Sequence, residues 1–175
     1  VRCFRGSEED VLDRYYQAAK EVNADIVIRI TADCPLIDPE IIDHIITRFI
    51  DEQPNYASNV LTRTYPRGLD TEVFSMSTLK RVWEEAKQKH EREHVTPYIL
   101  ENPEKFTVLS VKDDFNFSEH RWTVDTAEDL EFVKAVYKEF GGGSIFTWKD
   151  VIDFLEEKPD IQQINVNIDQ KSLKD

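Results

Sequence analysis

The chain has 175 residues and a formal net charge of −13, and 40% of its residues are hydrophobic while 33% are charged. This balance and the length predict one soluble domain. No apolar run approaches the roughly 20 residues that span a bilayer. Duplex nucleic-acid binders normally carry a basic patch. Two cysteines and no visible secretory signal predict a reduced, cytoplasmic protein. The acidic balance and the lack of a long apolar run predict no nucleic-acid and no membrane partner.

The first predicted elements are a helix, a strand and a second helix. Ser7 and Asp10 resemble a capping box, and the apolar residues that follow recur at helical spacing. A run rich in Ile and Val over 26–31 predicts a strand covered on both faces. Asp38 before Pro39 predicts the start of the next helix, with Asp as the N-cap.

Strand and helix patterns continue to alternate along the rest of the chain. A loop marked by Pro and Gly covers 64–70, and three glycines at 141–143 predict a linker. The alternation predicts a single α/β domain over 1–175 with a largely parallel sheet. The predicted strands are 56–61, 71–76, 106–112 and 120–124, and the predicted helices are 77–89, 94–101, 127–140 and 149–157.

Two acidic turns directly follow strand-like runs, with Asp33 in the first and Asp125 in the second. In a parallel α/β sheet, ligands bind just beyond the carboxyl ends of the strands. Mg²⁺ prefers oxygen ligands and substrate phosphates, so these turns suggest phosphoryl or nucleotidyl transfer. The alternative for Asp33 is a turn residue that satisfies backbone amides. Glu128 and Asp129 fall where a helix dipole favours acids, which predicts a structural role for them.

Other candidate residues have equally open interpretations. Arg67, Asp70 and Glu72 can bind sugar hydroxyls or carboxylates, or they can form a surface ion pair of little consequence. His94 lies in a polar run of the kind that is usually a solvated face, and Arg121 can contact phosphate or pair with an acid.

Cys34, within the first acidic turn, invites interpretation as a nucleophile. No His lies close to it in the sequence, and no cysteine-enzyme motif surrounds it. A small buried apolar residue is therefore the favoured interpretation.

Five segments together resemble, in order and spacing, the cytidylyltransferase family of the spore coat polysaccharide biosynthesis protein SpsF. The resemblance extends over nearly the whole chain and is far more specific than either acidic turn alone. The segments are 5–15 (RGSEEDVLDRY), 29–39 (RITADCPLIDP), 65–70 (YPRGLD), 91–98 (EREHVTPY) and 121–126 (RWTVDT).

This resemblance implies a three-layer α/β/α sandwich of the nucleotide-diphospho-sugar-transferase type with a mostly parallel sheet. It implies transfer of a cytidylyl group from CTP to a sugar hydroxyl or a carboxylic sugar, with release of pyrophosphate, and related enzymes make CMP-activated acidic sugars. By the same analogy Asp33 and Asp125 would be catalytic and hold Mg²⁺. The residues implied to bind substrate are Arg67, Asp70 and Glu72, with His94 and Arg121 as weaker candidates.

The chain departs from the family pattern at its start. The family normally begins with a strand and a loop of the type Gln-Ala-Arg-x-x-Ser-x-Arg-Leu-Pro-x-Lys, which cradles the triphosphate and the cytosine; no such loop occurs in 1–175. We therefore expect a domain incomplete at its N-terminus and inactive as this chain alone. A missing central strand would leave the 26–31 strand with an open edge, which predicts a homo-oligomer or a further N-terminal portion.

Two rival functions remain open at this stage. A glycosyltransferase of similar fold would use Asp33 with a nucleotide sugar, but the usual Asp-x-Asp pair is not formed around it. A non-catalytic assembly module would keep the fold without the nucleotide loop.

Overall fold

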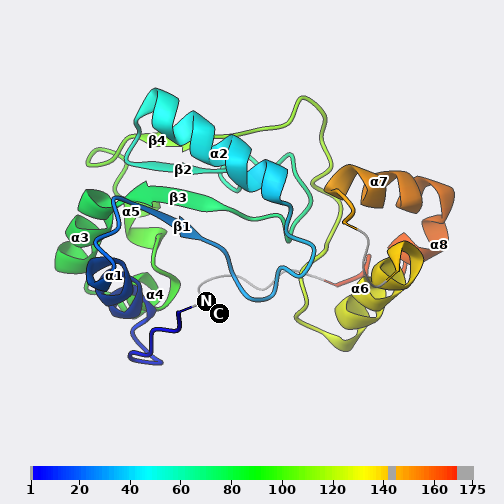
Figure 1. Ribbon diagram of the computed structural model, residues 1–175, viewed down its shortest axis with the longest axis horizontal. Coiled ribbons are helices and arrows are strands. Elements are labelled where there is room, and N and C mark those ends of the chain that lie inside the picture. Colours follow the sequence, from blue (N-terminus) through cyan, green and yellow to red (C-terminus); the bar gives the residue numbers. More distant parts are fainter. Residues whose placement is uncertain (1, 142–144, 169–175) are drawn as a thin grey trace.

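The computed structural model describes residues 2–141 and 145–168, and its centre is a four-stranded sheet (Figure 1). The strands lie in the spatial order β1-β3-β2-β4. Helices cover both faces of this sheet, with α2 over one face and α1, α3, α4 and α5 toward the other. The strands are β1 (Ile26–Arg29), β2 (Tyr56–Ser58), β3 (Glu72–Ser75) and β4 (Val108–Ser110).

The class prediction, α/β, is confirmed, but the prediction of a mostly parallel sheet is wrong. Among the described strands only β2 and β4 run parallel, and β3 is antiparallel to both β1 and β2. Residues 59–71 join β2 to β3 and contain no helix. A parallel partner needs a crossover connection, usually a helix, so this link without one returns the chain antiparallel to β2.

The predicted strand over 120–124 does not join the sheet. Arg121 forms an isolated parallel bridge with Arg67 in the loop before β3. The Arg67 N–H donates to the His120 carbonyl at 3.0 Å, and the Trp122 N–H donates to the Arg67 carbonyl at 2.7 Å. The apolar character of this segment thus reflects the burial of Trp122, which is 0% exposed, and not a place in the ladder.

Most helices lie where the sequence predicts them. Of the predicted helix over 94–101, the stretch 97–101 (α5) is confirmed, whereas His94 is the last residue of α4, and neither α4 nor α8 was predicted. None of the described helices has the length and apolarity needed to cross a membrane. The helices are α1 (Val11–Glu21), α2 (Pro39–Glu52), α3 (Met76–Glu85), α4 (Lys89–His94), α5 (Pro97–Glu101), α6 (Ala127–Phe140), α7 (Trp148–Glu157) and α8 (Pro159–Gln162).

Helix starts are set by short polar side chains. Asp10, one residue before α1, accepts from the Asp13 N–H, and Ser75 caps α3 where Ser77 was predicted to. Thr126 forms a capping box with Asp129 at the start of α6, as the sequence predicts for Thr126. Gly141 follows α6, while residues 142 and 143 of the predicted linker lie outside the described residues.

The side chains on the two faces of the sheet belong to two separate hydrophobic clusters. Tyr56 and Phe74 pack with α1 and α3 on one face, and Ala57 and Val73 pack with α2 on the other. Neighbouring residues of one strand point to opposite faces, so each strand contributes to both clusters. The cluster with α2 also includes residues of α6 and α7, which lie beyond one end of the sheet (Figure 1).

Asp38 connects two helix starts that are far apart in the sequence. One carboxylate oxygen accepts from the Glu40 N–H at 2.7 Å, which confirms the predicted cap of α2. The other accepts from the Trp148 N–H at 2.7 Å, at the first residue of α7. The carboxylate is buried, so both bonds form away from solvent. This one side chain fixes the first acidic turn against the C-terminal helices.

β1 lies at one edge of the sheet, paired with β3 on one side and with no other described strand. An open edge presents unpaired backbone groups that can recruit another chain. This arrangement agrees with the open edge expected for the 26–31 strand. Whether a second copy occupies it stays a prediction.

We expect the 175-residue chain to self-associate through β1, and Ile28→Lys to shift it toward a monomer. Ile28 is 38% exposed, and a charged side chain on an edge strand opposes pairing with another chain. Light scattering measures the mass of both forms. Ile50→Lys, at a 53% exposed position on α2, is the control and should leave the mass unchanged. A monomeric mass for the unsubstituted chain contradicts the prediction.

Candidate active site

Three loops that hold the predicted site residues are joined by backbone hydrogen bonds. The loop 64–70 meets the segment 120–122 through the two bonds of Arg67 described above. The Val124 N–H then donates to the Asp33 carbonyl at 2.9 Å. The first acidic turn, the loop 64–70 (the arginine loop, named for Arg67) and the second acidic turn are therefore immediate neighbours in the fold.

Gly68 allows the arginine loop to approach this closely. Its φ is +105°, a conformation that side chains of L-residues rarely adopt. A Cβ placed there would lie 2.7 Å from the Trp122 carbonyl carbon and 2.9 Å from the Thr123 nitrogen. The contact is with backbone, which cannot move aside, so this position requires glycine.

Asn59 holds the other end of the same loop. Its amide nitrogen donates to the Leu69 carbonyl at 2.7 Å, and its amide oxygen accepts from the Thr71 N–H at 2.9 Å. Asn59 is 0% exposed, so these bonds replace water for the loop backbone. The sequence analysis missed Asn59, because a lone Asn within a predicted strand gives no signal of its distant partners.

The two predicted metal ligands differ in their present contacts. Among the described residues, the Asp33 carboxylate contacts only the Cys34 thiol, at 3.8 Å. Asp125 is exposed, and one of its oxygens accepts from Arg121 at 2.6 Å. Both side chains thus offer oxygen atoms where the two turns meet, and oxygen donors suit a hard divalent cation.

A different group of acids and a histidine lies within 4.8 Å of one another, away from these turns. It consists of His90, Glu91 and Glu101. Glu91 accepts from two backbone N–H groups at the start of α4, and His90 bonds to Glu101 at 3.1 Å. These contacts are those of a helix cap and a surface ion pair.

Arg121 pairs with acids, which is one of the two alternatives that the sequence left open. Its guanidinium donates to both oxygens of Asp129, at 2.9 and 3.0 Å, and to Asp125. Asp129 is 0% exposed; burial alone would raise its pKa, but hydrogen bonds from Arg121 and Asn165 hold the pKa well below its usual range. The structural role predicted for Asp129 agrees with this network, which fixes the backbone of the second acidic turn.

Four of the five predicted substrate-binding residues line one pocket of about 490 Å³. The fifth, Arg121, lies outside it. The pocket is bounded by β1, by the arginine loop and by the segment that links α4 to α5. Its lining residues are Arg29, Thr31, Val60, Arg63, Arg67, Asp70, Glu72, His94, Thr96, Pro97, Leu100 and Glu101.

Both predicted acids of this pocket are paired, but not with Arg67. Asp70 accepts two hydrogen bonds from Arg63, at 2.6 and 2.8 Å. Glu72 is buried and pairs with Arg29. It also accepts from the hydroxyls of Tyr56 and Thr96, each at 2.7 Å.

Burial alone would lower the pKa of Arg29, but the adjacent Glu72 carboxylate raises it, so Arg29 stays charged. The sequence analysis missed both arginine partners, because their spacing from the acids follows no local pattern. Each ion pair satisfies a charge that the pocket would otherwise leave unpaired.

Arg67 and His94 are the polar lining residues left without such partners. Within the described residues, neither side chain forms a hydrogen bond or an ion pair. Burial and the nearby Arg63 lower the pKa of Arg67, although an arginine remains charged at any physiological pH. These two side chains are therefore the groups of the pocket that are ready to bind a ligand.

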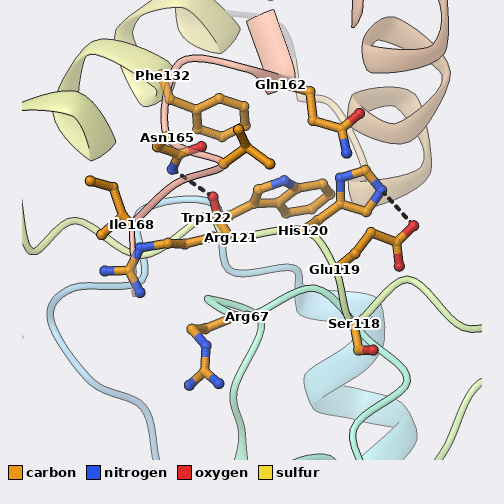
Figure 2. A pocket seen from close by; sticks show the side chains of 11 residues that line it. Arg67, Ser118, Glu119, His120, Arg121, Trp122, Phe132, Gln162, Asn165 and Ile168 are labelled. Atoms are coloured by element: carbon orange, nitrogen blue, oxygen red, sulfur yellow. Dashed lines mark hydrogen bonds and ion pairs between the residues drawn. The ribbon is translucent and has the colours of Figure 1, made fainter. Parts of the chain in front are cut away.

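A second, smaller cavity of about 140 Å³ is lined by residues 118–122, by Arg67 and by side chains of α6, α8 and the segment after α8 (Figure 2). The Trp122 indole N–H and the His120 Nδ1 are buried beside it without a hydrogen-bond partner among the described residues. Burial lowers the pKa of His120, so the imidazole is neutral at neutral pH. Asn165 donates to the Arg121 carbonyl at 2.9 Å, and Figure 2 shows Arg67 directed away from the indole.

Cys34 is buried, as the favoured interpretation of the sequence predicts. Burial raises the pKa of its thiol to about 11, although a contact with Thr31 opposes this shift. Since the thiolate is the reactive form, only about one thiol in ten thousand is reactive at pH 7. The structure thus argues against a nucleophilic cysteine.

We expect a reagent that labels exposed thiols to react with the native protein at Cys3 and not at Cys34. The expected rate at Cys34 is at least about 100-fold lower, because it is both buried and protonated. Peptide mass spectrometry after timed labelling measures both sites. Cys3→Ser should remove the fast reaction, and equal labelling of the two cysteines would contradict the expectation.

The family comparison matches residues 1–171 to the cytidylyltransferase model. The chain is 39% identical over its full length to an uncharacterised protein of Methanocaldococcus jannaschii, of which it covers 71%. It is 35% identical over 91% of its length to the spore coat polysaccharide biosynthesis protein SpsF of Bacillus subtilis, of which it covers 66%.

Solved structures give the same result. A cytidylyltransferase from Leptospira borgpetersenii superposes with a TM-score of 0.88 at 37% identity, covering 97% of this chain and 70% of that one. A CMP:2-keto-3-deoxy-manno-octonic acid synthetase solved with CTP shares the fold, with a TM-score of 0.56 at 17% identity over 78% of this chain and 71% of that one. The chain therefore spans about 70% of the length of these relatives, and it belongs to the cytidylyltransferase family.

Proposed function

We propose that the protein containing this chain transfers a cytidylyl group from CTP to a sugar during polysaccharide synthesis and releases pyrophosphate. The observation that supports this most directly is the meeting of two acidic turns beside a pocket with unpaired cationic and imidazole groups. Family membership and the SpsF relative point to the same reaction class. The acceptor is the hydroxyl of a sugar or of a carboxylic sugar, and in this proposal the sugar lies in the pocket.

The residues of the acidic turns fit Mg²⁺. Mg²⁺ is commonly bound by one or two carboxylates together with substrate phosphates and water, and Asp33 and Asp125 supply two carboxylates from adjacent turns. When bound, the ion would neutralise charge on the phosphates. Arg121 and Asp129 hold the turn that positions Asp125.

In the pocket, each residue has a distinct proposed role. Arg67 provides a fixed cation for an anionic group of the substrate, and guanidinium groups match carboxylate and phosphate oxygens well. His94 provides a ring nitrogen for a sugar hydroxyl. Asp70, although paired with Arg63, is partly exposed and keeps acceptor capacity toward hydroxyl groups. Glu72 is buried and accepts hydrogen bonds from three side chains of the protein, so its proposed role is to form part of the pocket wall.

We propose that residues 1–175 alone do not turn over CTP. The support is the sequence itself, in which no loop of the family's triphosphate-binding type occurs. The pocket and the acidic turns would supply the sugar side and the metal side of the reaction. Interactions with the nucleotide would come from groups outside these residues.

The function is tested with the complete protein encoded by the reading frame that contains this sequence. Pyrophosphate release is measured with CTP, Mg²⁺ and a panel of neutral and acidic sugars. Sugar-dependent release supports the proposal. Turnover of a nucleotide sugar in place of CTP would identify a glycosyltransferase, and binding of neither would identify an assembly module. Turnover of CTP by residues 1–175 alone would contradict the proposed inactivity of this chain.

In the complete protein, Asp33→Asn and Asp125→Asn are each expected to lower kcat by at least about 100-fold, or about 3 kcal/mol of barrier. The amide keeps the size of the side chain but loses the negative charge that a metal ligand needs. Initial rates over a Mg²⁺ titration measure the effect. Asp51→Asn, at an exposed position on α2, is the control and should keep full activity. Unchanged rates in either site variant would remove that residue from the site.

A further inference from the structure

The segment between α4 and α5 contains a backbone conformation that its sequence disfavours. Val95 has a φ of +73° and a ψ of −53°. The Thr96 N–H donates to the His94 carbonyl at 2.9 Å, which closes a three-residue turn around Val95. This is the rare, strained form of such a turn, and a β-branched residue at positive φ is a genuine outlier.

The next residue adds to the strain. Thr96 has a ψ of −10°, in the helical region, and it precedes Pro97. The proline ring clashes with a preceding residue in that region and pushes it toward extended conformations. The other non-glycine residues with positive φ in the described chain are Asn23 and Gln53, which are not β-branched and do not line the 490 Å³ pocket.

Contacts on both sides of the turn hold it in place. The Val95 side chain is 1% exposed and packs into the cluster that includes Tyr98 and Ile99. The Thr96 hydroxyl donates to Glu72 at 2.7 Å, and Glu72 is fixed by Arg29 and Tyr56 from β1 and β2. The sheet thus imposes the turn on a sequence that would not adopt it alone.

The turn lies directly beside the proposed sugar site. His94, Thr96 and Pro97 all line the 490 Å³ pocket; the Thr96 hydroxyl is bonded to Glu72, whereas the His94 imidazole has no hydrogen-bond partner among the described residues. Backbone strain persists where the surroundings enforce it, and such sites cluster at functional centres. A relaxed turn would let the end of α4 rotate and change the direction of the imidazole.

We propose that Val95 is a positioning residue whose strained backbone fixes the His94 imidazole toward the pocket. The inference deepens the proposed function, since it assigns the control of one sugar contact to a residue that does not touch the sugar. Packing of the buried Val95 side chain and the bond from Thr96 to Glu72 keep the turn in this conformation, which the Val95 Cβ itself disfavours. A glycine at this position relieves the strain and widens the range of conformations.

The test compares Val95→Gly with Val95→Ala in the complete protein. Both variants remove the branched side chain, and they differ only in the Cβ that causes the strain. Glycine is normally the less stable of the two, but relief of strain should make Val95→Gly at least as stable in thermal unfolding. A clearly lower Tm for Val95→Gly than for Val95→Ala would overturn the proposal.

Activity should follow the opposite order. We expect kcat/KM for the sugar to fall about tenfold further in Val95→Gly than in Val95→Ala, mostly through KM, because the sugar contact is misplaced. In a His94→Ala background, the difference between the two variants should disappear. Equal losses with and without His94 would show that Val95 acts on stability alone and would overturn the proposal.

A third measurement separates this inference from the proposed function. The chain has four histidines, so the imidazole signals of His94 can be assigned by NMR. Exchange broadening or averaging of these signals in Val95→Gly, but not in Val95→Ala, supports positioning even if CTP is never turned over. Identical His94 signals in both variants would overturn the positioning role, whatever the enzyme's activity.

Discussion

The site depends on the contact between the Gly68 turn and the backbone of Trp122 and Thr123. This contact leaves no room for a Cβ, and two hydrogen bonds of Arg67 on either side of it join the loop before β3 to the segment before α6. Because Val124 then bonds to Asp33, the same contact places the first acidic turn beside the second. One close approach of two backbones thus determines the relative positions of Arg67, Asp33 and Asp125.

Three arginines line one pocket, although the chain as a whole has a net charge of −13. Two of them are matched by internal carboxylates, Arg29 by Glu72 and Arg63 by Asp70. A buried charge without a partner is costly, so these pairs are required by the burial itself. The pairing leaves Arg67 as the arginine of this pocket whose side chain has no carboxylate partner among the described residues, which is why the proposed function assigns it an anionic group of the substrate.

The sequence analysis predicted the positions of the helices and strands more accurately than the direction of the strands and the pairing of distant side chains. Caps at Asp38 and Thr126 and the runs of β1 and α6 are local patterns, so they could be predicted. The direction of β3 depends on a helix-free connection, and Glu72 and Asp129 find partners, Arg29 and Asn165, that lie far away along the chain. Such non-local pairings leave no periodic signal. The resemblance to a family assigned roles to the candidate site residues, and these roles stay predictions, whereas the turn at Val95 contradicts the local preferences of its own sequence.

The double hydrogen bond of Asp38 has a consequence for the order of folding. The bond from the Trp148 N–H joins residues that are 110 positions apart, so it can form only when the starts of α2 and α7 are both present. During synthesis, the turn that contains Asp33 therefore lacks the bond between Asp38 and Trp148 until α7 has been synthesised. Contacts of such long sequence separation form late, because the intervening loop must first be closed. A transient opening of α7 would break the bond between Trp148 and Asp38. The first acidic turn would then lose one of its supports, so its order depends on that of α7.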